Sequence, residues 1–208
     1  MEAVMGFYSE RIVPRCVDFL LSRPPILELR ERAVQGLRGD VLEVGFGSGL
    51  NLPYYSADVT SVLAIEPSML ARSLAQPRID AVRVPVRWGG LDGAALDVPD
   101  ASVDAALSTF TFCTIPDLTA ALRELRRVIR PGGALHFLEH GRSPDASVAR
   151  WQDRLNPLQQ RLAGGCNLNR AIADSVREAG FCMDALETYY LPGPRFAAYM
   201  FEGRARRC

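Results

Sequence analysis

The sequence predicts an α/β fold in which a doubly wound, seven-stranded and mostly parallel sheet carries helices on both faces. First, short apolar runs rich in β-branched residues alternate with amphipathic helical patterns. Second, the first such run, 41–44, breaks directly into the glycine-rich segment 45–49. Third, the strand-like runs 181–190 and 196–202 are separated by Leu-Pro-Gly-Pro, which predicts a final antiparallel hairpin.

The other strands and the helices follow from apolar spacing and from breakers such as Pro and Gly. We expect the remaining strands at 61–65, 81–86, 103–108 and 134–138. We expect helices within 7–35 (two, broken at 23–25), from 50, from 67, and at 116–129, 145–162 and 170–179, the last capped by Asn169.

Length and charge favour a single soluble domain. A chain of 208 residues with 48% hydrophobic content buries one full core, so we expect a domain at 39–208 preceded by a helical lid at 1–38. The 24 basic and 24 acidic residues balance, which argues against nucleic acid as a partner. No run approaches the ~18 apolar residues of a spanning helix, so we expect no membrane anchor.

The five cysteines are odd in number and show no CxxC spacing. This pattern argues against a disulfide framework and against a zinc site, and it favours a reducing cytoplasm. We therefore expect a cytoplasmic protein without a bound metal.

The glycine-rich segment predicts a ligand cradle at the end of the first strand. Gly45, Gly47 and Gly49 allow a tight turn and leave backbone N–H groups open to a bound molecule. A dinucleotide fingerprint would require Gly or Ala at position 50, where this chain has Leu50. The segment instead has the pattern ExGxGxG, which begins at Glu43.

This pattern resembles motif I of the class I S-adenosylmethionine (SAM)-dependent methyltransferases. The resemblance extends to PDASVD at 99–104 and to RxxRPGG at 127–133, and it covers about residues 39–200. It implies a Rossmann-like fold, SAM as cofactor and S-adenosylhomocysteine as product. The cofactor-binding residues that it implies are Glu43, Gly45, Phe46, Gly47, Gly49, Glu66, Pro67, Met69, Asp92, Gly93, Thr109 and Phe110.

Two of these residues have a specific expected contact. Glu66 lies about 20 residues after the first glycine, where a carboxylate accepts hydrogen bonds from the ribose hydroxyls. Alternatively, Glu66 stabilises the N-terminus of the following helix. Asp92 would face the adenine amino group, or would only be solvated.

A narrower resemblance is to the methyltransferase-like seven group, whose animal members are thiol S-methyltransferases. It is carried by TFTFC at 109–113, LEH at 138–140, WQ at 151–152 and GCNLNR at 165–170. Phe46 departs from the Cys or Thr common in that group, and the hydrophobic N-terminal anchor of the animal proteins is not found. The substrate-binding candidates are Tyr8, Phe112, Cys113, Trp151, Cys166 and Asn167.

Methyl transfer from a sulfonium is an in-line displacement that depends mainly on alignment and exclusion of water. His140 ends the fifth strand, where ligands bind in a parallel sheet, and is our candidate for the general base or acceptor-orienting group. Alternatively, His140 only holds the chain around Gly141.

We expect an enzyme that methylates a small molecule, with a thiol as acceptor. A phenol- or quinone-type O- or C-methyltransferase shares every cofactor motif and stays an alternative. A nucleic-acid base methyltransferase is disfavoured because TFTF replaces the [DNS]PP[YF] tetrad. A SAM-binding protein without catalysis is a further alternative, and the chain is expected to be a monomer or homodimer.

Overall fold

The computed structural model describes residues 12–208, and these build one seven-stranded sheet in the order β3-β2-β1-β4-β5-β7-β6. Every strand is parallel to its neighbours except β7, which pairs antiparallel with β5 and β6. The strands are β1 (Gly39–Val44), β2 (Val59–Ile65), β3 (Val86–Gly90), β4 (Val103–Thr109), β5 (Ile129–His140), β6 (Phe181–Tyr190) and β7 (Tyr199–Arg207). The predicted fold class is confirmed.

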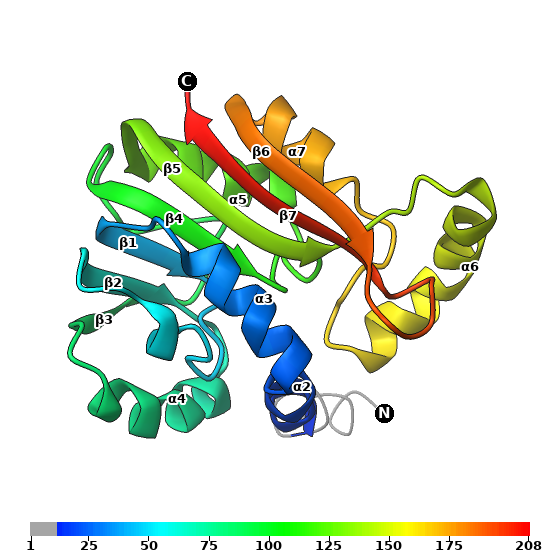
Figure 1. Cartoon of the computed structure of the whole chain (residues 1–208), viewed down its shortest axis with the longest axis horizontal. Helices are drawn as coiled ribbons and strands as arrows, with labels where there is room; N and C mark the ends of the chain where they lie inside the picture. Colours follow the sequence, from blue (N-terminus) through cyan, green and yellow to red (C-terminus); the bar gives the residue numbers. More distant parts are fainter. Residues whose placement is uncertain (1–11) are drawn as a thin grey trace.

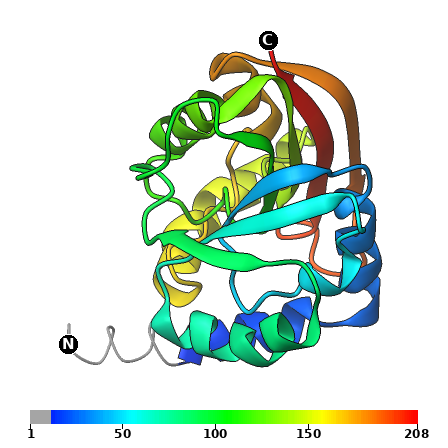
Figure 2. The same ribbon diagram turned by 90° about the vertical axis from the view of Figure 1, so that its left-hand side faces the viewer.

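Helices cover both faces of the sheet, with α3 in front of it and α5 and α7 behind it in Figure 1. The edge-on view of Figure 2 shows the same layers. The helices are α2 (Val13–Leu21), α3 (Pro24–Val34), the 3-10 helix η2 (Leu52–Tyr54), α4 (Met69–Ala81), α5 (Leu118–Val128), α6 (Ala146–Leu162) and α7 (Ile172–Glu178). Within the described part of the chain, no helix is long and apolar enough to cross a membrane.

Each face of the sheet packs against its helices through a separate apolar cluster. On the α5 and α7 face, Leu42 and Phe137 pack with Leu122 and Val176. On the other face, Val41 and Ala105 belong to the cluster that includes α3, η2 and α4 residues. Adjacent residues of β1 thus face opposite helical layers, as the alternation of side chains along a strand requires.

Some element boundaries differ from the prediction. Helix α4 continues through Pro77 to Ala81, so the third strand begins at Val86 and not at 81. The expected α-helix after the glycines is only the single 3-10 turn η2. Asn169 does not cap α7, because its amide donates to Asp153 Oδ1 at 2.8 Å and the N-cap residue is Ala171.

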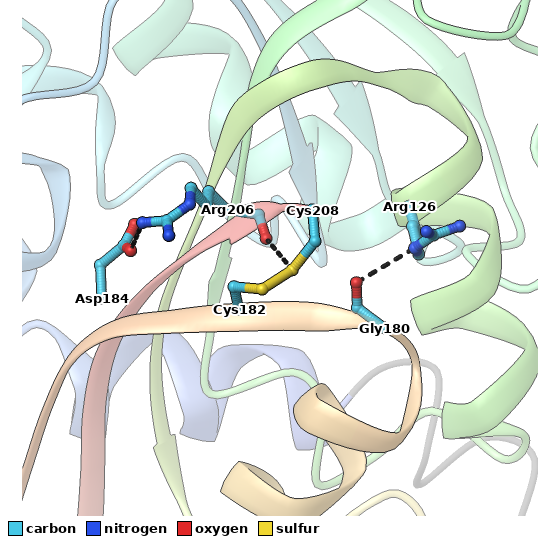
Figure 3. Close-up of a disulfide and its surroundings, with 6 residues drawn as sticks. All are labelled: Arg126, Gly180, Cys182, Asp184, Arg206 and Cys208. Atoms are coloured by element: carbon cyan, nitrogen blue, oxygen red, sulfur yellow. Dashed lines mark hydrogen bonds and ion pairs between the residues drawn. A yellow bond between two sulfur atoms is a disulfide. The ribbon is translucent and has the colours of Figure 1, made fainter.

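The expectation of no disulfide is wrong, because Cys182 and Cys208 are joined (Figure 3). Cys182 in β6 pairs with Arg206 in β7, and this register brings Cys208 at the chain end beside it, with a Cα–Cα distance of 5.8 Å. The two cysteines are 26 residues apart, and their spacing in the sequence does not reveal that antiparallel strands bring them together. The disulfide also removes the cysteine argument for a reducing compartment.

Candidate active site

A cavity of about 610 Å³ opens at the carboxyl ends of β1, β2 and β4. Its walls are the glycine-rich loop after β1, the turn after β2, the segment 109–116 and the inner face of α2. In a doubly wound sheet this edge is where ligands bind, because the strand order reverses there and the following loops diverge.

The glycine loop makes close backbone approaches that side chains would block. Gly45 and Gly47 have φ of +69° and +58°, in the left-handed region. A Cβ on Gly45 would lie 2.0 Å from Thr111 Oγ1, whereas a Cβ on Gly47 would meet no atom nearer than 3.9 Å. Gly45 is therefore required by packing, and Gly47 presents open backbone to the cavity that it lines.

Glu66 links the glycine loop to the end of β2. Its Oε2 accepts a hydrogen bond from Gly47 N at 2.8 Å, and its Oε1 accepts one from Ser68 N at 2.8 Å. Burial raises the pKa of this carboxyl, while the two backbone bonds lower it. Each oxygen keeps a further lone pair, so the carboxylate can still accept hydrogen bonds from a ligand in the cavity.

The geometry fits SAM at the cofactor end of the cavity. An open glycine backbone beside a carboxylate matches the needs of a nucleoside with a vicinal diol. Of the predicted cofactor residues, the cavity wall includes Gly45, Phe46, Gly47, Glu66, Pro67, Asp92, Gly93, Thr109 and Phe110. Glu43, Gly49 and Met69 are not part of it, and Met69 is 70% exposed.

Glu43 lies beneath the loop in a buried polar network. Its carboxylate accepts hydrogen bonds from Asn51 Nδ2 at 2.7 Å and from Tyr55 Oη at 2.6 Å. Asn51 and Thr109 also accept from Arg30 Nη1, at 2.9 and 2.7 Å. Burial raises the pKa of Glu43 to about 7, although these hydrogen bonds and Arg30 lower it.

Arg30 is a site residue that the sequence analysis missed. It comes from α3, lines the cavity and is buried, and burial lowers its pKa to about 10 despite the nearby Glu43 and Glu139. Its Nε has no hydrogen-bond partner among residues 12–208. A buried guanidinium at the cavity can take a carboxylate from a ligand, such as the methionine carboxylate of SAM. No motif surrounds Arg30, so only its place in an amphipathic helix next to the site could have identified it.

A second missed contact joins α2 to the glycine loop. Ser48 Oγ donates to Asp18 Oδ1 at 2.5 Å, and Arg78 of α4 lies 3.2 Å from the same oxygen. Arg78 also donates to Ser48 O at 2.9 Å. Asp18 thus connects α2 with the glycine loop and with α4. These residues are too far apart in sequence for a local pattern to predict the contact.

The predicted substrate residues that lie within 12–208 do not form the cavity wall. Tyr8 lies outside the described residues, Trp151 is 56% exposed on α6, and Phe112 is fully buried. Cys113 belongs to the segment 109–116 and Asn167 is hydrogen-bonded to its carbonyl, but Cys113, Cys166 and Asn167 do not line the cavity. Their roles in substrate binding stay predictions.

The GCNLNR motif instead joins two segments. Asn167 donates from its backbone N and its Nδ2 to Cys113 O, at 2.8 and 2.9 Å. Its Oδ1 accepts from Gln160 Nε2 at 2.6 Å, and Arg170 donates to Phe112 O. Every polar group of the Asn167 side chain is therefore paired within the protein.

The neighbouring WQ motif has a similar role. The buried Gln152 accepts from Ser143 N at 2.9 Å and donates to Gly141 O at 2.9 Å and to Phe196 O at 3.1 Å. It therefore fixes α6 to the chain that follows β5.

His140 faces sulfur and not the cavity. Its Nε2 lies 3.1 Å from Cys166 Sγ, and its buried Nδ1 has no hydrogen-bond partner within 12–208. A hydrogen bond with Cys113 and burial raise the pKa of Cys166, so that this thiol is protonated at neutral pH and can donate to Nε2. The role of His140 as a general base stays a prediction.

Comparison with known families agrees with this geometry. The family described as "Methyltransferase domain" matches residues 42–137. The human thiol S-methyltransferase TMT1A is 32% identical over 171 residues, covering 79% of this chain and 68% of that protein. The rat thiol S-methyltransferase TMT1B is 30% identical, and the match covers 71% of this chain but only 62% of that protein's length. A phosphatidylethanolamine N-methyltransferase from Cereibacter sphaeroides is 37% identical, covering 80% of this chain and 81% of that protein.

Two solved structures with the same fold are described as methyltransferases. A SAM-dependent methyltransferase from Thermotoga maritima, described as a possible histamine N-methyltransferase, superposes with a TM-score of 0.67 at 22% identity over 98% of this chain and 99% of that chain. A geranyl diphosphate methyltransferase solved with sinefungin gives 0.69 at 14% identity over 88% of this chain and 78% of that chain. The chain therefore belongs to the class I SAM-dependent methyltransferases, and SAM is its cofactor.

Proposed function

We propose that this methyltransferase transfers the methyl group of SAM to the sulfur of a small thiol. The single observation that carries the proposal is that the cavity wall is largely apolar beyond the cofactor-binding residues. There the wall combines Val13, Val17 and Leu21 of α2 with Ile115 and Pro116 after β4. The similarity to thiol S-methyltransferases at 30–32% identity supports the same acceptor.

Within the described residues, each carboxylate of the cavity wall already accepts at least one hydrogen bond from the protein. Asp18 accepts from Ser48, Glu66 accepts from two backbone N–H groups, and Asp92 accepts from Ala94 N at 2.8 Å. Within residues 12–208, such a wall offers no strong general base, which disfavours an acceptor that must be deprotonated by one. A thiol, with a pKa near ~8.5, supplies a few per cent of thiolate at neutral pH by itself.

The protein's contribution is then to bind, orient and exclude water. SAM supplies an electrophilic methyl group whose leaving group is already activated. Glu66 and the backbone at Gly47 would hold the nucleoside, and Arg30 the carboxylate end. The apolar wall of α2 and the 115–116 segment would shield the reacting sulfur, since a desolvated thiolate is a stronger nucleophile.

The test is an assay of S-adenosylhomocysteine release with small thiols of graded pKa, compared with phenols, quinols and amines. We expect turnover with thiols, and at fixed pH we expect the rate to follow the thiolate fraction of each thiol. A reaction without protein measures the uncatalysed background, and Glu66→Ala, which removes a proposed cofactor contact, should lower turnover at low SAM concentration. Turnover confined to phenols or quinols would overturn the proposal.

An amine acceptor is the second candidate, because the phosphatidylethanolamine N-methyltransferase matches over 81% of its length at 37% identity. Phosphatidylethanolamine in detergent micelles belongs in the same panel. Release with that lipid and not with any thiol would replace the thiol by an amine.

A further inference from the structure

Three groups that bind soft metals meet behind the cavity wall. Cys113 Sγ, Cys166 Sγ and a ring nitrogen of His140 all lie within 4.8 Å of one another. Both cysteines are buried and neither is in the disulfide. We propose that Cys113, His140 and Cys166 bind one thiophilic metal ion, Zn²⁺, a site that goes beyond the proposed methyl transfer.

The distances suit a tetrahedral zinc ion. Zinc binds thiolate sulfur at ~2.3 Å and imidazole nitrogen at about 2.0–2.1 Å, so its ligands lie roughly 3.5–3.8 Å apart. His140 Nε2 and Cys166 Sγ are 3.1 Å apart, and the whole set lies within 4.8 Å. Side-chain movements of less than about an ångström therefore suffice to admit the ion.

The scaffold holds the three groups together independently of any ion. Cys113 follows β4, His140 ends β5, and Cys166 lies between α6 and α7. Asn167 donates two hydrogen bonds to the carbonyl of Cys113, so the residue next to one cysteine is fixed to the backbone of the other. A site of this kind loses little entropy when the ion binds, because its ligands are already ordered.

Charge balance and the histidine tautomer also suit an ion in this place. When the ion binds, the two thiols release their protons to solvent and the resulting thiolates neutralise the divalent cation, so the filled site carries no net charge into a buried region. The Cys166 thiol that donates to His140 Nε2 already selects the tautomer with the proton on Nδ1, so Nε2 carries the lone pair that a metal ion needs.

Three protein ligands leave one coordination position on zinc. Sites with three protein ligands keep that position for water or an exogenous ligand. Thr114, which follows Cys113 in sequence, lines the cavity, whereas the three proposed ligands do not. We infer metal binding from this geometry and assign the ion no step in methyl transfer.

The first measurement is the metal content and spectrum of the full-length protein. We expect about one zinc per chain after purification with zinc and dialysis against a weak chelator. Replacement by Co²⁺ should give tetrahedral d–d bands together with sulfur-to-cobalt charge transfer. No stoichiometric zinc, a cobalt spectrum without thiolate bands, or a Cys113–Cys166 disulfide in the isolated protein would overturn the proposal.

Variants then identify the ligands. Cys113→Ser and Cys166→Ser should each lower zinc affinity by more than the ~100-fold that loss of an outer contact costs. Cys16→Ser is the matched control, because Cys16 is an exposed free cysteine on α2, and it should keep full zinc. SAM binding by each variant checks that it is folded.

The wild-type cobalt spectrum decides the question even if a buried variant does not fold. Unchanged zinc affinity in folded Cys113→Ser and Cys166→Ser would contradict the assignment. Because the readout is metal and not turnover, failure of this site and failure of the thiol proposal are distinguishable.

Discussion

Glu66 combines two tasks at one carboxylate, since it accepts two backbone hydrogen bonds and also lines the cavity. Glu66→Gln keeps the shape but places an amide N–H against one of these backbone donors. Hydrogen bonds to a charged group contribute about 1.5–3 kcal/mol, so we expect SAM affinity to fall by at least ~10-fold. Calorimetric titration with SAM measures this change.

The control for this substitution is Glu187→Gln, at an exposed position of β6, which should leave SAM affinity unchanged. If Glu66→Gln changes the dissociation constant less than twofold, Glu66 only supports the chain around Ser68 and is not a cofactor contact.

The two glycines of the loop should respond differently to a methyl group. Gly47→Ala adds a Cβ where no protein atom lies within 3.9 Å, and the left-handed backbone costs about 1–2 kcal/mol. Gly45→Ala would place a Cβ 2.0 Å from Thr111 Oγ1, which forces backbone movement. We expect Gly47→Ala to reduce SAM affinity with a small loss of stability, and Gly45→Ala to destabilise the fold.

Urea unfolding and SAM titration of both variants separate these effects. Equal stability losses would contradict the distinction between a cavity-facing glycine and a packed one.

Among single residues, several that belong to local motifs line the cavity as predicted, whereas Glu43, Gly49 and Met69 of the same motifs do not. The glycines and Glu66 lie within 25 residues of one another on consecutive elements, so their spacing alone indicates a common site. Arg30 and Asp18 reach the same cavity from helices that precede β1, and no spacing rule connects them to it. Their positions depend on how α2 and α3 pack, which is a tertiary property.

Helix α2 differs from α3 in how it is held. Helix α3 buries Leu29, Ala33 and Val34 against the sheet, whereas α2 has no buried residue. We propose that α2 is the mobile part of the predicted lid and that Asp18 fixes it to Ser48 and Arg78.

Asp18→Asn should release α2 with little change in global stability. Ion pairs at the surface contribute ~0.2–1 kcal/mol, so the midpoint of urea unfolding should move only slightly. We expect faster amide hydrogen exchange across 13–21 and weaker SAM binding. The control is Asp174→Asn, which removes an exposed ion pair with Arg177 in α7 and should change neither. Unchanged exchange in α2 would show that Asp18 does not hold the helix.

Element prediction succeeded where an apolar pattern and a breaker agreed. The helix α5 and the parallel strands β1, β2 and β4 were found because the surrounding Gly and Pro mark their ends. The third strand was displaced because α4 continues through Pro77 to Ala81 and an irregular segment at 82–85 follows it, so that β3 begins only at Val86. Local propensity cannot decide such a boundary when tertiary packing supports a proline within a helix.

For the whole molecule, strand alternation predicted the topology but not the pairing of its cysteines. Cys182 and Cys208 meet through the register of β6 and β7, and Cys113 and Cys166 meet through the Asn167 contact. Both relationships join residues far apart in sequence. The absence of CxxC spacing therefore argues only against a disulfide or a zinc site formed by cysteines close together in sequence.

Global stability should depend on pH through the buried Glu43. Burial is the largest influence on its pKa, about 7 against an ordinary value of 4.5, and Asn51, Tyr55 and Arg30 only partly offset it. Between pH 4.5 and 7, Glu43 therefore keeps its proton in the folded state but has lost it in the unfolded state. The shifted pKa of Glu43 contributes roughly 3 kcal/mol at most to the free energy of unfolding. This contribution is fully present below pH 4.5 and is lost as pH rises through 7.

Other groups titrate in the same window, so the test needs a difference between two proteins. Burial raises the pKa of Glu66 and Glu139, which acts in the same direction, and lowers the pKa of His136, which acts in the opposite one. Glu43→Gln mimics the protonated carboxyl at every pH and leaves those groups in place. Urea unfolding of both proteins from pH 5 to 8 should show the wild type losing stability relative to Glu43→Gln as pH rises. A difference that is constant with pH would contradict the titration of Glu43 within this range.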